Sequence, residues 1–368
     1  MAHRSPSSKR LLSLLLGIAA ASASLSGCSI GGERGYYLTR PQAREPSDAV
    51  IPLQPSPPRS LAMFEGDTGR VATWADLMEG VAWAEVIFLG EVHDHVEGHL
   101  LQQAIVEDAL ASFPGTAVSM EMFERDDQPV VDAYLRGEIS VDELVERTKS
   151  LGWGASPFRE SSAEERRAIW DLNYQPVVDE AKLRGARVIA ANAPRAYVRR
   201  ARMEGYDALR ALPAEERALF DLPGSLEDGV YRSAFDAVML REGEDRNDPE
   251  VRTRIDNTYR SRQVWDTTMG RSIAMAFEPR EGDPDGAAVT KVIHLVGGFH
   301  VDRRAGTVTR LLEARPGTRV LTIQVIPADE RRITDGDRGR ADLVIYAKRM
   351  TPTESPETTP SADGAPAS

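Results

Sequence analysis

Short apolar segments alternate with helix-like segments through much of this chain, and this alternation constrains its fold more than any other feature. The apolar segments are mostly rich in Val and Ile, as strands buried on both faces of a parallel sheet are. They lie at Val86–Leu89, Ala117–Met120, Val188–Ala191, Val292–Val296, Val320–Ile326 and Leu343–Ala347. Helical patterns at about 94–112, 128–149 and 162–184 separate the first of these segments. The alternation predicts right-handed βαβ units, and therefore an α/β fold with a mostly parallel sheet covered by helices.

One long stretch departs from this alternation. From about Pro194 to Pro279 the sequence carries helical patterns and no convincing strand. The simplest interpretation is a smaller all-helical subdomain at about 194–279, inserted into an α/β domain that spans 61–350.

Residues 1–28 have the layout of a secretory signal. Basic residues precede an apolar core at Leu11–Ala21, which is shorter than the about 20 residues that a membrane-spanning helix needs. The following Leu25-Ser26-Gly27-Cys28 resembles a bacterial lipobox, which predicts lipidation of Cys28 and attachment to a membrane. Ser29 at the next position resembles a signal for sorting to the outer membrane of a Gram-negative bacterium. We therefore expect a lipid-anchored protein of the cell envelope.

The composition predicts unstructured segments at both ends of the folded part and argues against nucleic acid as a partner. Residues 29–60 are rich in Pro, Ser, Arg and Gly and predict a flexible tether, whereas 351–368 lack large apolar residues and predict a disordered tail. The formal charge is −12, and removal of the three basic residues of the leader takes it to −15. An acidic chain with no Lys/Arg cluster in its folded part argues against nucleic acid as a partner.

Polar residues follow several of the predicted strands, at the point where each strand ends. Glu91 and His93 follow the first strand, Glu121 the second, Asn192 the third, and His300 follows the later strand at Val292–Val296 after a Gly-Gly turn. Because the carboxyl ends of parallel strands converge at a topological switch point, we expect these residues to line one crevice. Histidine titrates near neutral pH and is the commonest metal ligand, so the crevice is a candidate site for a cofactor or for acid–base chemistry.

Other histidines and missing motifs narrow the possible chemistry. His95 and His99 are spaced as neighbours on one helix face, but the segment is not the metalloprotease H-E-x-x-H motif and favours a solvated polar helix start over a metal site. His294 lies within a strand and favours a hydrogen-bonded core residue. The chain has no G-x-S-x-G elbow and no paired-cysteine pattern, so a serine hydrolase and a zinc ribbon have no support.

Five ordered motifs resemble those of the ChaN-like haem-binding lipoproteins, within the Tiki, TraB and erythromycin-esterase-like superfamily. They are Leu-Gly-Glu-Val-His at 89–93, Ser-Met-Glu-Met-Phe at 119–123, Ala-Ala-Asn-Ala-Pro-Arg at 190–195, Gln-Val-Trp-Asp-Thr-Thr-Met at 263–269 and Gly-Gly-Phe-His at 297–300. The resemblance runs from about Val86 to Ala347 and implies a Rossmann-like domain with a smaller helical one. It also implies haem bound at a homodimer interface, with a tyrosinate as axial ligand supported by a histidine.

The resemblance singles out Tyr174, in a Tyr-x-Pro sequence, as the first candidate for the haem iron ligand. Tyr134, Tyr197 and Tyr259 stay open as alternatives. The supporting histidine is His93 or His300, either of which is also an alternative metal ligand. Because a phenol has a pKa near 10, binding iron as phenolate needs a hydrogen-bond partner or the charge of the metal.

Two functions fit these residues. The first is a lipid-anchored haem-binding protein for iron uptake or haem handling, with Arg195 and Arg199 near the haem propionates, Asn192 in the pocket, and an outer-membrane receptor as a possible partner. The second is a hydrolase of the wider superfamily, metal-dependent through a divalent ion or metal-free. Its catalytic residues would be Glu91, His93, Glu121 and His300.

Overall fold

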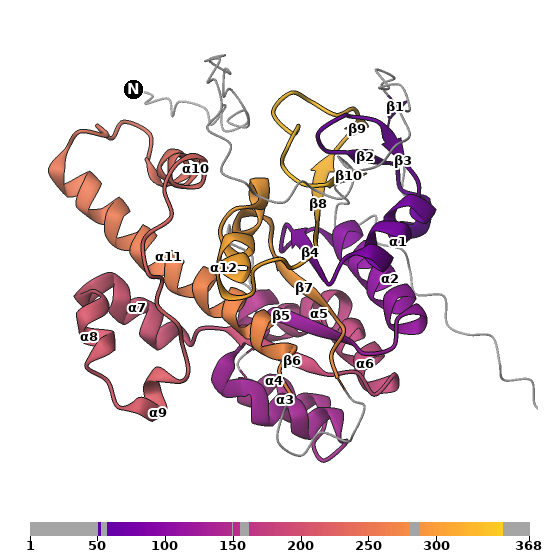
Figure 1. Cartoon of the computed structure of the whole chain (residues 1–368), viewed down its shortest axis with the longest axis horizontal. Helices are drawn as coiled ribbons and strands as arrows, with labels where there is room; N and C mark the ends of the chain where they lie inside the picture. The colour runs from indigo at the N-terminus through magenta and orange to yellow at the C-terminus, as the bar shows by residue number, and fades with distance from the viewer. Residues whose placement is uncertain (1–50, 53–56, 149, 155–161, 280–287, 349–368) are drawn as a thin grey trace, which may run out of the picture. The chain divides into compact units, whose positions relative to one another are not determined.

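The predicted α/β class is confirmed in the computed structural model, which describes residues 51–52, 57–148, 150–154, 162–279 and 288–348 (Figure 1). The predicted leader with Cys28, most of the predicted tether and the predicted tail lie outside the described residues.

An eight-stranded mixed sheet forms the centre of the fold, in the order β3-β2-β10-β8-β4-β7-β5-β6. Its strands are β2 (Met63–Glu65), β3 (Val71–Ala72), β4 (Val86–Glu91), β5 (Thr116–Glu124), β6 (Val188–Asn192), β7 (Lys291–Gly297), β8 (Val320–Ala328) and β10 (Leu343–Lys348). Every strand predicted from the sequence is present, and these strands pair in parallel. The short β2 and β3 add an antiparallel edge, and a separate pair joins β1 (Ile51–Pro52) to β9 (Glu330–Arg331).

Two predicted helices are each divided in two. The pattern at 128–149 forms α3 (Gln128–Leu135) and α4 (Val141–Thr148), separated by a turn in which Gly137 has a positive φ of 76°. The pattern at 162–184 forms α5 (Ala163–Asn173) and α6 (Gln175–Leu183), which meet at Tyr174. Pro176 lies in the first turn of α6, where its missing N–H breaks no helical hydrogen bond. This break places the Tyr174 side chain inside the protein rather than along a continuous helix face.

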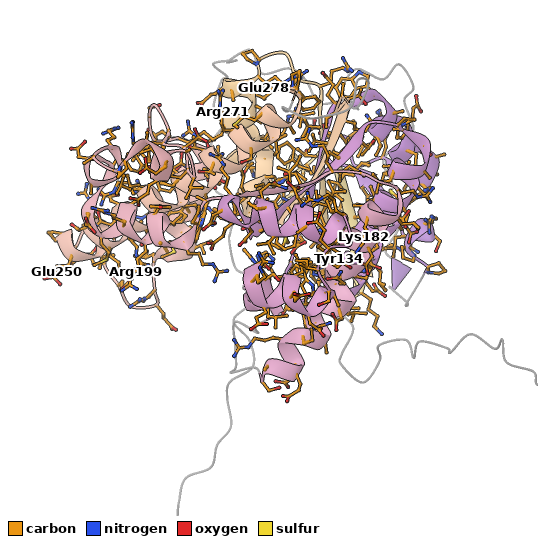
Figure 2. All side chains as sticks on the ribbon, turned by 90° about the horizontal axis from the view of Figure 1, so that it is seen from below. Tyr134, Lys182, Arg199, Glu250, Arg271 and Glu278 are labelled. Carbon is orange, nitrogen blue, oxygen red and sulfur yellow. The ribbon has the colours of Figure 1, made fainter. Side chains whose placement is uncertain are left out.

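Each central strand sends alternate side chains to opposite faces of the sheet. From β4, Ile87 and Leu89 enter the core beneath α1 (Trp74–Trp83), α2 (Val96–Ser112) and α6, whereas Val86 and Phe88 enter a second core. That second core contains side chains of α11 (Pro249–Ala276) and α12 (Thr307–Ala314). On the first face, α3 and α6 also pack together, with Lys182 Nζ 3.9 Å from the centre of the Tyr134 ring (Figure 2).

Between β6 and β7 the described residues form helices and no strand. These helices are α7 (Arg195–Glu204), α8 (Tyr206–Arg210), α9 (Ala214–Arg217), α10 (Val230–Met239) and α11. The first half of α11 packs Ile255 and Tyr259 against α10, whereas its second half packs Met269 and Ile273 against the sheet. This long helix therefore joins the helical region directly to the α/β core (Figure 1). No helix within the described ranges is both long and apolar enough to cross a membrane.

The connections that leave β4 and β7 run in opposite directions across the sheet, from β4 to β5 and from β7 to β8. These strands are neighbours, with Glu91 paired in register with Gly297. The connection after β4 runs through α2 on one face, and the connection after β7 runs through α12 on the other. Adjacent strands with connections on opposite faces leave a crevice at their carboxyl ends, which is where ligands bind in open α/β sheets.

Candidate functional site

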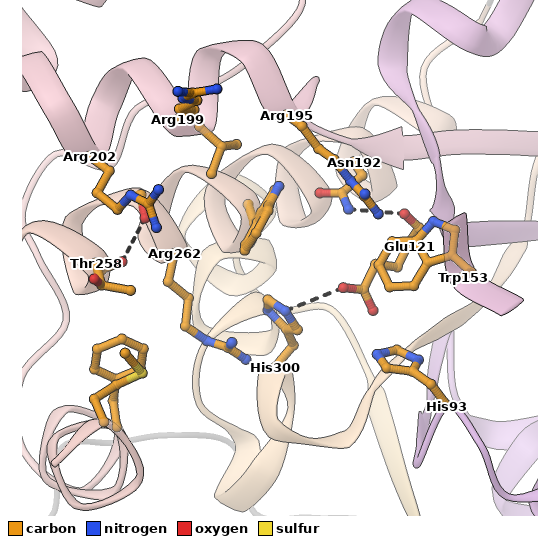
Figure 3. A pocket seen from close by; sticks show the side chains of 15 residues that line it. His93, Glu121, Trp153, Asn192, Arg195, Arg199, Arg202, Thr258, Arg262 and His300 are labelled. Carbon is orange, nitrogen blue, oxygen red and sulfur yellow. Dashed lines mark hydrogen bonds and ion pairs between the residues drawn. The ribbon is translucent and has the colours of Figure 1, made fainter. Parts of the chain in front are cut away.

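A cavity of about 590 Å³ opens at this crevice, and its size lies within the range of small-molecule sites (Figure 3). Four of the predicted site residues at strand ends line it: His93, Glu121, Asn192 and His300. Arg195 and Arg199, predicted beside the propionates, also line it. The remaining lining residues are Trp153, Val198, Arg202, Phe235, Met239, Thr258, Ser261, Arg262 and Trp265. The predicted convergence at one crevice is thus present in the structure.

Glu91 lies directly behind the cavity wall and connects two of the predicted residues. Its Oε1 atom accepts hydrogen bonds from Tyr174 Oη and His93 Nδ1, both at 2.7 Å. Its Oε2 atom accepts one from Gln102 Nε2 at 2.8 Å. The Glu91 side chain is only 1% exposed, whereas that of His93 is 41% exposed. Glu91 therefore fixes the orientation of His93, with the Nδ1 edge of the ring held by the carboxylate.

This arrangement sets the protonation of His93. Burial disfavours the imidazolium, but the hydrogen bond and negative charge of Glu91 outweigh it and raise the pKa of His93 to about 9. For Glu91 itself, burial acts to raise the pKa, but the charges of His99 and His93 prevail and lower it below its usual value. At neutral pH the pair is a carboxylate beside an imidazolium.

The side chain of Tyr174, the first candidate for the iron ligand, does not line the cavity. Its side chain is fully buried, with the ring centre 4.8 Å from that of His99, and its hydroxyl is held by Glu91. Burial and the adjacent Glu91 charge raise the pKa of Tyr174 well above its usual value, so the phenol stays protonated. Among the described residues, no tyrosine lines the cavity; this holds for the alternatives Tyr134, Tyr197 and Tyr259 as well.

A second carboxylate–histidine pair faces the same cavity from the other side of Glu121. His300 Nδ1 donates to Asp266 Oδ1 at 2.6 Å, and Tyr231 Oη donates to Asp266 Oδ2 at 2.7 Å. His300 Nε2 lies 3.4 Å from Glu121 Oε1, and Glu121 Oε2 accepts a hydrogen bond from the Gly297 N–H at 2.6 Å. The cavity therefore contains two imidazoles, each held through Nδ1 by a carboxylate that also accepts a tyrosine hydroxyl.

Gly297 keeps the space between the first imidazole and Glu121 open. A Cβ atom at this position would lie 3.1 Å from His93 Nε2 and 3.4 Å from Glu121 Oε2. The absence of a side chain therefore leaves room for a ligand atom to approach both groups.

Helices α7 and α11 supply most of the remaining wall, each with one face, and Trp153 together with Phe235 and Met239 of α10 completes it. Arg195, Val198, Arg199 and Arg202 come from α7, and Thr258, Ser261, Arg262 and Trp265 come from α11. Both sets have the i, i+3, i+4, i+7 spacing of a single helix face. This spacing is the sequence signal that could have found Arg202, Arg262 and Trp265, which our sequence analysis did not select as site residues.

Asn192 and Arg195 shape the end of the cavity near β6. Asn192 Nδ2 donates to the Glu121 backbone carbonyl at 2.9 Å and thereby connects the ends of β5 and β6. The Arg195 guanidinium lies 5.2 Å from the centre of the Trp153 ring and 3.6 Å from a Glu124 oxygen. Asn192 is thus a positioning residue, whereas Arg195 presents charge at the rim.

The other histidines have structural partners. His294 is buried, and its Nδ1 lies 2.9 Å from Ser119 Oγ, as expected for a core histidine. His95 and His99 are both buried, so the predicted solvated helix start is wrong at both histidines. The ring nitrogens of His99 lie beside Gln102 Oε1 and the His93 carbonyl. Within the part of the chain that the structure describes, no group of three or more His, Cys, Asp or Glu side chains is placed to hold a metal ion.

Comparison with protein families identifies one match. A family model described as haem-binding uptake, Tiki superfamily, ChaN matches residues 77–311, which is well over half of the chain and includes every cavity residue. No curated protein matches the chain.

Solved structures with similar folds include a ChaN structure. "Cofacial heme binding to ChaN of Campylobacter jejuni" matches with 16% identity and a TM-score of 0.54, over 77% of this chain and 96% of that one. The type III effector HopBA1 matches with 13% identity and a TM-score of 0.39, over 83% and 99% of the two chains. A mutant of the erythromycin esterase EreC in its open conformation matches with 12% identity and a TM-score of 0.38, over 68% and 72%.

The coupling between Glu91 and His93 predicts a measurable pKa change. In Glu91→Gln the charge is removed, so the pKa of His93 falls from about 9 toward 6.5, which NMR titration of the imidazole would measure. Because the folded-state pKa of His93 is raised, the stabilisation that its protonation contributes is complete below pH 6.5 and is lost as the pH rises through about 9. Because the pKa of Glu91 is lowered, the carboxylate side of the pair is lost only in acid, as the pH falls below the usual value of 4.5.

Asp94→Asn is the matched control, because Asp94 is exposed and contributes less to the raised pKa of His93 than Glu91 does. It should lower the His93 pKa only slightly. An unchanged His93 pKa in Glu91→Gln would contradict the coupling.

Proposed function

The chain belongs to the family of haem-binding uptake proteins of the Tiki superfamily that includes ChaN, and we propose that it binds haem in the cavity at the carboxyl ends of β4, β5, β6 and β7. The observation that carries this proposal is the composition of the cavity. Two carboxylate-held imidazoles, several aromatic rings and four arginines surround a single space of small-molecule size. Haem is flat and apolar in its ring, anionic at its propionates, and needs an axial ligand for its iron.

The side chains fit these three requirements. Trp153, Phe235 and Trp265 offer apolar surface to the macrocycle. Arg195 and Arg199 from α7 lie where their guanidinium groups can pair with carboxylates near the rim (Figure 3). Bound haem would supply iron as an electron-accepting centre; everything else in the site is supplied by this chain.

We assign the axial position to His93 rather than to Tyr174. His93 lines the cavity, and its Nδ1 is held by Glu91, the arrangement in which a carboxylate orients a metal-binding imidazole and raises its basicity. Metal binding displaces the proton that the raised pKa retains. Tyr174 supports His93 indirectly, through its hydrogen bond to Glu91. The second imidazole, that of His300, lies beside Glu121, with His300 Nε2 3.4 Å from Glu121 Oε1.

Haemin binding by the purified protein tests the proposal. We expect a haem absorption spectrum in the wild type, and at least about tenfold weaker binding with an altered spectrum in His93→Ala, because the axial ligand is lost. Tyr174→Phe removes one hydrogen bond to Glu91 and should keep the spectrum.

The alternatives give distinct results. A ferric phenolate band that disappears in Tyr174→Phe and persists in His93→Ala would make the tyrosine the ligand. Absence of any haemin binding by the wild type would overturn the proposed function.

We propose further that haem brings two copies of the chain together. The support is the Campylobacter jejuni relative, whose structure is described as binding haem cofacially. Sedimentation of the same protein with and without haemin tests this association, and a monomer in both states would contradict it.

A second candidate function follows from the paired imidazoles. Glu121, beside Gly297, is placed to take a proton from a water that attacks a scissile carbonyl, and the His93 imidazolium is placed to protonate the leaving group. A protein that binds no haemin but hydrolyses esters or amides, with the activity lost in His93→Ala and Glu121→Gln, would favour this hydrolase.

We also propose that the protein is attached to the bacterial envelope through lipid on Cys28, where an outer-membrane receptor could deliver haem. The support is the lipobox-like sequence Leu25-Ser26-Gly27-Cys28 followed by Ser29. In cells, Cys28→Ser should abolish incorporation of labelled palmitate and move the protein from the membrane fraction to the soluble one. Ser29→Asp should keep the lipid and change only the membrane to which the protein sorts; unchanged labelling in Cys28→Ser would contradict the anchor.

A further inference from the structure

Arg262 is an unusual arginine within the cavity wall. Its guanidinium lies 4.3 Å from the centre of the Phe299 ring, and its Nε donates to Tyr231 Oη at 2.9 Å. Burial and the adjacent Asp266 charge raise the pKa of Tyr231 well above its usual value, so this phenol is a neutral partner. Over the residues that the structure describes, Arg262 forms no ion pair with a carboxylate, and its Nη2 is buried without an acceptor. Buried arginine charges are normally paired.

A second donor lies one helical turn further along the same face of α11. Trp265 Nε1 is also buried and has no acceptor among the described residues. Both residues line the cavity, and Trp265 packs edge-on to His300 with ring centres 6.4 Å apart. A buried donor without an acceptor costs free energy, so two of them at one wall indicate that a ligand supplies the missing acceptor.

The nearby carboxylates do not provide that acceptor. Asp266 already accepts hydrogen bonds from His300, Tyr231 and Thr307, and Glu121 accepts from Gly297 and faces His300. The Arg262 guanidinium lies beside His300 in the inner part of the cavity, whereas Arg199 and Arg202 lie on α7 (Figure 3). Asp266 and Glu121 act on Arg262 through their charges, and neither accepts a hydrogen bond from its Nη2.

We propose that Arg262 and Trp265 form an inner anion subsite that takes one carboxylate of the bound ligand. The inference rests on the proposed function: for haem, it places one propionate inside the cavity, against α11, with the iron toward His93 and the strand ends. The second propionate then meets the exposed Arg195 and Arg199 at the rim. Arg262 Nη2 and Trp265 Nε1 would each donate a hydrogen bond to this carboxylate.

Iron-free and esterified porphyrins separate this subsite from iron ligation. Binding of protoporphyrin IX, haemin and protoporphyrin IX dimethyl ester is measured by quenching of tryptophan fluorescence. In Arg262→Gln, we expect at least about tenfold weaker binding of both diacids and no change for the diester. Trp265→Phe keeps most of the ring and removes its N–H, and should weaken the diacids by a smaller factor, read by quenching of the remaining tryptophans.

Arg271→Gln is the matched control, since Arg271 is exposed on α11 and lies outside the cavity lining (Figure 2). It should bind all three porphyrins as the wild type does. If Arg262→Gln does not fold, the wild-type protein still tests the subsite. A subsite that binds a buried carboxylate requires the wild type to bind the diester at least about tenfold more weakly than the diacid.

Equal binding of diacid and diester by the wild type, or a folded Arg262→Gln that binds the diacids as tightly as the wild type, would overturn the subsite. Failure of the wild type to bind any porphyrin would instead overturn the proposed function.

Discussion

The buried carboxylate of Glu91 is the interaction on which the site depends. It lies at the end of β4 and is contacted by side chains from α2, from the α5–α6 junction and from the segment after the strand. A buried charge is expensive unless hydrogen bonds and opposite charge compensate it. Gln102, Tyr174 and His93 provide that compensation together. Loss of any one partner would leave an oxygen of the desolvated carboxylate short of a hydrogen-bond donor, so the three side chains are held in one geometry.

The sheet topology explains why this carboxylate lies beside a cavity. Because β4 and β7 send their connections to opposite faces, neither α2 nor α12 covers the carboxyl ends of the two strands. Helices α7 and α11 supply most of the remaining wall and bring arginines to a crevice whose floor carries carboxylates and imidazoles. The resulting cavity has an acidic, histidine-containing end and a basic, aromatic wall. That division matches a ligand with a metal centre at one place and carboxylates at another.

The short apolar segments predicted the parallel strands. The rule that ligands bind at the carboxyl ends of parallel strands then predicted the site residues that follow these strands. Glu121, Asn192 and His300 needed only the positions of their strands. Asp266 and Arg262 follow no strand. Arg262 shares the spacing of one helix face, but which face of this 28-residue helix points into the cavity depends on packing against distant elements. The direction of the Tyr174 hydroxyl could not be predicted either. It points to Glu91 because the helix breaks between α5 and α6, whereas the sequence pattern at 162–184 predicted one helix.

The central claim is that one cavity holds haem between a Glu91-supported His93 and the arginines of α7 and α11. A crystal structure of the protein with haemin tests it most directly. The account predicts the macrocycle in this cavity, with iron bonded to His93 Nε2 and the Glu91–Tyr174 hydrogen bond intact. Iron bonded to the Tyr174 oxygen with Glu91 displaced, or haem bound outside the cavity, would contradict it.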